Sequence, residues 1–342
     1  MRMLQVMRTA APLLWAIAVA APGVHAAEPT AVPAQSAPAQ AAPAAAAKAA
    51  APTPAAPTPA ETTPAPGADE PLPVADAQPE VSVHGSPAEA LRAVLERARK
   101  DAADQPPRIV AFGEYHQTTG KTQIKSALKR FTEQLLPILQ PETSDLVIET
   151  FLTEGNCGKK EEAVVKDVEK TTKRPQTTES ELVTLIKQAK AGGVQPHILQ
   201  VSCKQYESVL GSDGSVDYEK MLRLLADLLR ERFTTLRERR VKAGVDKIVA
   251  VYGGALHNDL YPSQKELLPF TFGPAAARGF PGRYLEVDLY VPEFIAGDQN
   301  VSKEPWFPRY SKQARAGKTI LVRRGPASFV ILFPQSNKKN NK

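Results

Sequence analysis

Residues 108–116, Arg-Ile-Val-Ala-Phe-Gly-Glu-Tyr-His, run from an apolar segment directly into a glycine and a histidine. Residues 247–257, Lys-Ile-Val-Ala-Val-Tyr-Gly-Gly-Ala-Leu-His, repeat this arrangement. A short, continuous apolar run is typical of a strand that is buried on both faces of a parallel sheet. Ligands bind beyond the carboxyl ends of such strands, so the two Gly-x-x-His motifs predict that His116 and His257 share one sheet edge.

The rest of the chain alternates between strand and helix patterns. The predicted strands are Arg108–Phe112, Asp145–Glu149, His197–Val201, Lys247–Val251, Tyr284–Tyr290 and a final hairpin of Thr319–Arg323 with Ser328–Phe333. The predicted helices are Ser86–Asp101, Lys121–Leu139, Glu161–Lys173, Glu179–Ala191 and Asp217–Lys242. This alternation predicts an α/β fold, with a mainly parallel sheet, helices on both faces and a C-terminal antiparallel hairpin.

Two glutamates accompany the histidines at the predicted edge. Glu114 lies inside the first motif, and Glu149 closes the apolar run that begins at residue 146. A carboxylate that ends a buried strand is costly unless it is paired or bound to a metal. The candidate catalytic residues are therefore Glu114, His116, Glu149 and His257.

Imidazoles and carboxylates are ligands of first-row divalent metals. We expect His116, Glu149 and His257 to bind such an ion. Glu114 is either a fourth ligand or the general base for a metal-bound water. The lone remaining histidine of the predicted domain, His197, begins a strand and is expected to be structural.

The residues around the two motifs have predicted supporting roles. Gly113 and Gly254 are expected to let the backbone turn sharply at the cofactor, and Asn258 and Asp259 to orient His257. The segment 113–122 also resembles a phosphate-binding loop. It has six residues between its glycines where that loop needs four, so we expect Thr119 to cap the next helix instead.

The first quarter of the chain is unlike the rest. Of the 54 residues 27–80, 34 are alanine or proline, and none is aromatic. Such a stretch cannot bury enough apolar surface to offset its ordering entropy. We expect a linker over 27–85, a single α/β domain over 86–334 and a disordered basic tail over 335–342.

Residues 1–26 have the pattern of a secretory signal peptide. Arg2 and Arg8 precede an apolar run of about a dozen residues, and small residues stand at positions 24 and 26. No cysteine lies at the cleavage point, so a lipid anchor is not expected, and no later run is apolar enough to span a membrane. The sequence predicts an exported protein, periplasmic or secreted.

Export makes the two cysteines a candidate disulfide. Cys157 and Cys203 each follow a predicted parallel strand, so both are expected at the same edge of the sheet. The alternative is two unrelated thiols.

The chain has a net charge of +6, with basic and acidic residues interspersed. A basic stripe interleaved with aromatic residues, as single-strand binders use, is absent from the sequence. We therefore expect a small-molecule or peptide substrate rather than a nucleic acid. The sequence leaves the oligomeric state open.

Three segments, "IVAFGEYH", "DLVIET" and "VAVYGGALH", resemble the motif blocks of the Tiki-like superfamily, which includes the ChaN-like haem-binding uptake, TraB and erythromycin-esterase-like proteins. The resemblance covers residues 108–258. It implies an α/β core whose polar site uses Glu114, His116, Glu149 and His257, with Gly254 in the last block. ChaN-like proteins often have a further histidine in the helix after the first block, and this chain has none there.

Members of this superfamily cleave peptides, open ester rings or bind haem, so the resemblance does not select a reaction. The first expectation is a metal-dependent hydrolase of peptide, amide or ester bonds. The alternative is a non-catalytic binding protein for haem, iron or another small ligand, in which the same histidines are ligands. A third possibility is an interaction domain without activity.

Overall fold

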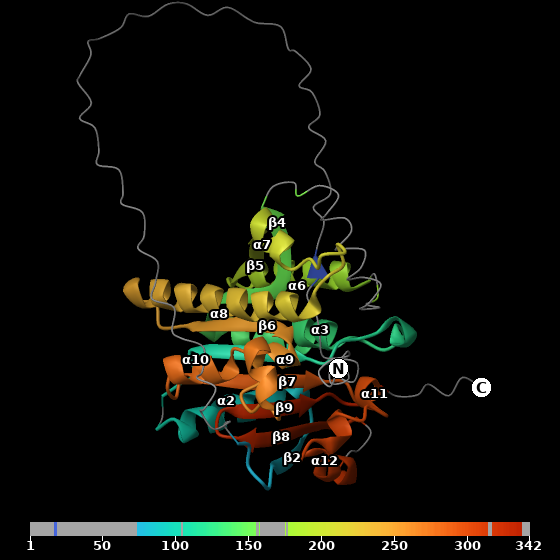
Figure 1. Ribbon diagram of the computed structural model, residues 1–342. Coiled ribbons are helices and arrows are strands. Elements are labelled where there is room, and N and C mark those ends of the chain that lie inside the picture. The colour runs from blue at the N-terminus through green and yellow to red at the C-terminus, as the bar shows by residue number, and fades with distance from the viewer. Residues whose placement is uncertain are drawn as a thin grey trace, which may run out of the picture.

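The computed structural model describes residues 17–18, 74–103, 105–154, 157, 175, 177–313 and 317–336 (Figure 1). The predicted helix Glu161–Lys173, the tail beyond 336 and nearly all of the predicted signal peptide and linker lie outside these residues. Among the described residues, no helix is both long and apolar enough to cross a membrane.

One sheet organises the domain, in the order β1-β4-β6-β3-β7-β9-β8-β2, with β5 beside β4. Its strands are β1 (Ile17–Ala18), β2 (Glu80–His84), β3 (Ile109–Glu114), β4 (Thr143–Glu154), β5 (Gln195–Ser202), β6 (Ile248–Gly254), β7 (Tyr284–Tyr290), β8 (Thr319–Gly325) and β9 (Ser328–Leu332). Neighbouring strands in the run β5-β4-β6-β3-β7-β9 pair in parallel, whereas β8 is antiparallel to both β9 and β2. The predicted fold class and the C-terminal hairpin are therefore confirmed.

The two motif strands lie side by side at the centre of the sheet. β3 pairs with β6 in register from Ile109 opposite Val249 to Glu114 opposite Gly254, and every residue of both strands is buried. Alternate residues face opposite sides, so Phe112 and Tyr252 join one core and Ala111 and Val251 the other. Two cores, one on each face, explain why the sequence of these strands is continuously apolar.

Helices cover both faces of the sheet (Figure 1). They are α2 (Pro87–Asp101), α3 (Ala127–Arg130), α4 (Leu136–Leu139), α6 (Thr177–Ala191), α7 (Cys203–Ser208), α8 (Tyr218–Lys242), α9 (Ala255–Asn258), α10 (Gly273–Gly279), α11 (Pro292–Ile295) and α12 (Phe307–Gln313). Shorter turns are the 3-10 helices Thr119–Lys121, Gln140–Glu142, Lys265–Phe270 and Val301–Lys303 and the π-helix Phe131–Leu135. Residues of α2, α3 and α6 pack in the first core, whereas α7, α8 and α10 pack in the second.

The predicted boundary between linker and domain is wrong. Glu80–His84, expected in the linker, forms edge strand β2 along β8. Arg323 of β8 forms ion pairs with Asp76 and Glu80, and Arg309 donates to the carbonyl of Pro79. The domain therefore includes the residues from about Val74 onward.

The helix predicted at Lys121–Leu139 begins later, at Ala127. Ser126, rather than Thr119, caps it by accepting a hydrogen bond from the Lys129 amide. The Gln117 side chain donates to the carbonyls of Lys121 and Ile124 and so fixes the preceding segment as a loop. These side-chain contacts replace the helical hydrogen bonds that the periodicity alone would predict.

The predicted disulfide is confirmed, with Cys157 and Cys203 bonded and their Cα atoms 5.5 Å apart. It joins the chain beyond β4 to the first residue of α7.

At the amino ends of the strands, His197 and Arg240 both bind the buried Asp145, which agrees with a structural role for that histidine.

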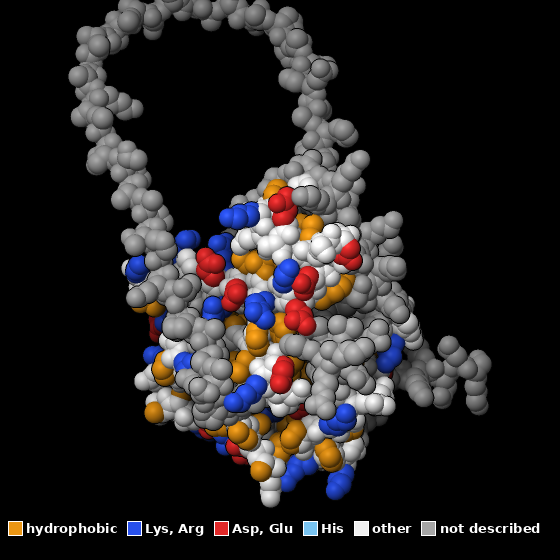
Figure 2. Space-filling view, viewed as in Figure 1, with side chains coloured by type: hydrophobic (Ala, Val, Ile, Leu, Met, Phe, Trp, Pro, Cys, Tyr) orange, Lys and Arg blue, Asp and Glu red, His pale blue; other side chains and the backbone are white. Residues whose placement is uncertain are grey.

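Charged side chains of both signs are interspersed on the face shown in Figure 2. Among the described residues, short-range pairs within helices include Lys100 with Glu96 and Arg230 with Asp227. Exposed pairs of this kind contribute little to stability.

Candidate functional site

The end of β3 carries the first pair of candidate residues. Glu114 Oε1 lies 2.5 Å from His116 Nδ1, and Glu114 Oε2 accepts a hydrogen bond of 2.6 Å from the Tyr252 hydroxyl. Glu114 and His116 are both buried. An ionised Glu114 would accept this hydrogen bond from Nδ1–H and would leave Nε2 as the basic nitrogen of the His116 ring. Glu114 is thus engaged in orienting His116.

The second pair joins β4 to α9. His257 Nε2 lies 3.6 Å from Glu149 Oε1, while Glu149 Oε2 accepts a hydrogen bond of 2.6 Å from the Gly254 amide. Glu149 is 7% exposed and His257 is 1% exposed. The short connection from β6 into α9 therefore supplies both the histidine and the amide that holds its carboxylate partner.

The segment Phe270–Phe272, which precedes α10, forms hydrogen bonds with His257. Its Nδ1 lies 2.8 Å from the Phe270 carbonyl, and its own carbonyl accepts hydrogen bonds from Thr271 Oγ1 and the Phe272 amide. The Phe270 contact places the proton on Nδ1, so Nε2 points toward Glu149 as a lone pair. Burial lowers the pKa of the imidazole to about 4, although the hydrogen bond to Phe270 opposes this shift.

The motif glycines serve close packing instead of the sharp turns that we expected. Neither Gly113 nor Gly254 is among the described residues with a left-handed φ. A Cβ on Gly113 would lie 2.3 Å from Asn258 Oδ1 and 2.6 Å from the Ala255 Cα. At the other motif, the neighbouring Gly253 leaves room for the Glu149 carboxylate, which a Cβ would approach to 2.2 Å. Gly254 contributes its amide.

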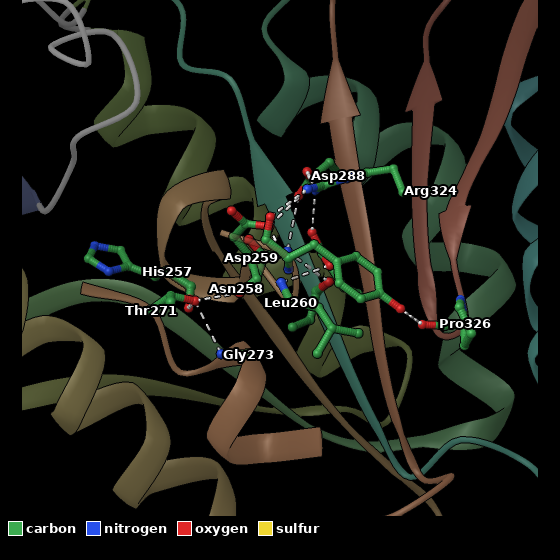
Figure 3. Close-up of polar contacts among 12 residues, drawn as sticks. His257, Asn258, Asp259, Leu260, Thr271, Gly273, Asp288, Arg324 and Pro326 are labelled. Carbon is green, nitrogen blue, oxygen red and sulfur yellow. Dashed lines mark hydrogen bonds and ion pairs between the residues drawn. The ribbon is translucent and has the colours of Figure 1, made fainter. Parts of the chain in front are cut away.

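The side chains of Asn258 and Asp259 do not bond to the His257 ring directly. Asn258 Nδ2 donates to Asp288 and to the Ala111 carbonyl, and Asp259 accepts from Arg324 (Figure 3). The Phe270 carbonyl holds the ring instead. Figure 3 shows that His257 points away from this second polar group, which lies nearer to β7 and β8.

Sequence reasoning missed the buried charges behind Asn258 and Asp259. Glu286 and Asp288 lie on β7 and Arg324 on β8, and Arg324 NH1 contacts both carboxylates, at 3.0 and 3.4 Å. Burial raises the pKa of Glu286 and of Asp288, and the nearby Arg324 opposes both shifts. The signal was present: two acidic residues, two positions apart, interrupt the otherwise apolar strand Tyr284–Tyr290.

The structure brings the four predicted catalytic residues together in the two pairs described above. Glu114 ends β3, and His116 and His257 follow β3 and β6 directly, but Glu149 lies within β4, which continues to Glu154 instead of ending at Glu149 as predicted. Within the described parts of the chain, no group of three or more His, Cys, Asp or Glu side chains is arranged to hold a metal ion. The described donor pair that fits a metal best is His257 with Glu149. Two ligands bound to one tetrahedral zinc at about 2.0–2.1 Å lie roughly 3.3 Å apart, close to their 3.6 Å separation.

Comparison with known proteins returns no match: no family model, no curated protein and no solved structure matches the chain. The resemblance of its three motifs to the Tiki-like superfamily therefore stays a prediction.

Proposed function

We propose that the protein is an exported, metal-dependent hydrolase of peptide, amide or ester bonds, related to the Tiki-like and ChaN-like proteins. The observation that carries the proposal is the orientation of the buried His257 ring. Its Nδ1 is fixed by the Phe270 carbonyl, and its buried Nε2 has no hydrogen-bond partner among the described residues and lies 3.6 Å from a Glu149 oxygen. Histidines that bind metals are commonly oriented in this way, through the nitrogen that does not bind.

In this proposal, His257 and Glu149 are ligands, and His116 becomes the third when a bound ion draws it toward this pair, because the described residues form no three-ligand group without the ion. Glu114 and Tyr252 orient His116 so that its basic nitrogen is the Nε2 atom. A divalent metal held there would lower the pKa of a bound water and polarise the carbonyl of the substrate. His116 Nε2 can instead take the proton of the water, if His116 does not bind the ion.

The deciding measurement is the metal content of the purified protein, in wild type and in the variants His116→Ala and His257→Ala. We expect stoichiometric divalent metal in the wild type, and loss of both the metal and hydrolytic activity in the two variants. His84→Ala is the matched control, because His84 lies on edge strand β2 and its side chain hydrogen-bonds only to Ser82 among the described residues.

Equal metal content and equal cobalt affinity in wild type and both variants, with the fold retained by circular dichroism, would overturn the proposal. A Soret band that forms with haem and is lost in His116→Ala or His257→Ala would instead support the binding-protein alternative.

A further inference from the structure

A buried arginine connects the C-terminal hairpin with the segment that follows His257. Arg324 of β8 has a side chain only 9% exposed. Its guanidinium lies 3.0 Å from Glu286 Oε1, 3.4 Å from Asp288 Oδ2 and 3.0 Å from Asp259 Oδ1. The first two carboxylates belong to β7, whereas Asp259 lies two residues after His257. Arg324 therefore joins a rigid strand to a segment at the candidate site.

The β7 side chains that Arg324 holds also bind this segment directly. Asp288 accepts a hydrogen bond of 3.1 Å from Asn258 Nδ2, and Glu286 Oε2 accepts one of 3.0 Å from the Leu260 amide. From the same strand, the Tyr284 hydroxyl donates to the Asn258 carbonyl at 2.7 Å. Three consecutive residues after His257 are thus fixed from β7 and β8 (Figure 3).

Helix α9 cannot fix His257 by itself. It has four residues and no side-chain capping hydrogen bond, and helices this short are unstable without tertiary contacts. Its orientation must come from the contacts on either side. One side is the Phe270–Phe272 segment, whose Thr271 hydroxyl bonds to the carbonyls of both His257 and Asp259. The other side is the Arg324 cluster.

Stability alone does not explain this cluster. A buried ion group of this kind is often no more stabilising than apolar side chains of the same volume, because desolvation offsets the attraction between the charges. What the group does supply is direction, since the planar guanidinium can engage three carboxylates only when they take fixed positions around it.

We propose that Arg324 is a positioning residue for His257: by holding Asp259 against Glu286 and Asp288, it keeps the His257 Nε2 atom directed at Glu149. The importance of this direction rests on the proposed function of His257. The positioning itself can be measured without a substrate or a metal.

The test uses two variants, Asp259→Ala and Arg324→Lys. The first removes the ion pair between Arg324 and Asp259 but leaves Arg324 with both β7 carboxylates. The second keeps the positive charge but replaces the planar guanidinium with a compact ammonium that does not reproduce its geometry. Nuclear magnetic resonance of the histidine ring nitrogens reports which nitrogen of His257 carries the proton, and the missing signal in His257→Gln assigns it. We expect one Nδ1–H form in the wild type and a mixture of forms in both variants.

Titration of the metal-free full chain with Co²⁺ provides the second measurement. We expect the affinity to fall at least tenfold in both variants, the range typical for loss of a residue that orients a metal ligand. The control is Arg323→Lys, because Arg323 is the neighbour on β8 but pairs with Asp76 and Asp101 instead. It should match the wild type in both measurements.

An unchanged ring spectrum in folded Asp259→Ala and Arg324→Lys would overturn the positioning role. If Arg324→Lys does not fold, Asp259→Ala decides alone. If the wild type binds no Co²⁺, the proposed metal function fails, and the ring spectra still decide whether Arg324 positions His257.

Discussion

Gly113 leaves the space that helix α9 needs at this site, because it has no side chain. The residue lies where α9 crosses the end of β3, close to Asn258, Ala255 and Asp288. Any larger residue would displace α9, which carries His257. The first motif glycine therefore supports the histidine of the second motif.

Gly113→Ala should destabilise the protein by about 3 kcal/mol, because the new methyl group would meet the Ala255 backbone, which cannot give way cheaply. Urea unfolding measures this loss. Gly279→Ala is the control, since a Cβ there meets nothing within 4 Å and the φ of Gly279 is not left-handed. Equal midpoints of urea unfolding for the two variants would contradict the packing role of Gly113.

His257 should make the stability of the metal-free protein depend on pH. Its pKa falls from 6.5 to about 4 on folding, so between these values the unfolded state binds the proton more readily. The contribution of His257 to the free energy of unfolding is complete above pH 6.5. It is lost as the pH falls toward 4, by about 3 kcal/mol in all. The difference in unfolding free energy between wild type and His257→Gln, measured in a chelator from pH 7 to 4, should shrink accordingly. A constant difference would show that His257 titrates normally.

The positions of Glu114, His116 and His257 could be predicted from the sequence, because strand direction alone places the residues at and just after a strand's end at the carboxyl edge. Glu149 was expected to end its strand but lies within β4. The partners of these residues could not be predicted. Whether Asn258 faces His257 or Asp288 depends on strands β7 and β8, which are distant in sequence and contribute buried charges that no local pattern around the motif reveals.

At the scale of elements, local periodicity predicted the long helices better than the connections. α8 begins after Asp217 and ends at Lys242, as its apolar spacing and its capping residue indicate. The helix predicted directly after β3 was wrong because long-range contacts hold that segment. Lys121 Nζ donates hydrogen bonds to the carbonyls of Glu293 and Phe294 in α11. Such contacts leave no periodic signal.

The Cys157–Cys203 disulfide should be a major source of stability, because it closes a loop with a sequence separation of 46 residues. Chain-entropy arguments give about 4 kcal/mol for a loop of this length. Cys157→Ser/Cys203→Ser should lower the free energy of unfolding by that order under oxidising conditions. Wild type measured with a reductant should match the double variant. No difference between the oxidised wild type and the double variant would show that the bond adds nothing.

At the scale of the whole molecule, the sequence predicted the layered α/β architecture because buried parallel strands are apolar throughout and their covering helices are periodic. It misplaced the start of the domain. β2 follows an Ala/Pro-rich stretch and is mostly exposed, with the burial pattern of an edge strand, so only its pairing with β8 identifies it.

Compared with a chain that begins at Val74, a second chain that begins at Gly85 should therefore lose roughly 3 kcal/mol of unfolding free energy. The second chain lacks the β2 hydrogen bonds and the partners of Arg323 in residues 76–80. Urea unfolding of the two shortened chains compares them. Equal stability of the two shortened chains would mean that β2 is dispensable.

The place of β2 also has a mechanical consequence. From Val74 onward the described chain enters the sheet through β2, and β8, β9 and β7 separate this strand from β3. A pull applied at Val74 therefore acts first on the β2–β8 pairing and on the contacts of Arg323 and Arg309 beside it. The edge strand would yield before the load reached β3, β4 and β6, so a domain held at Val74 keeps those three strands unstrained.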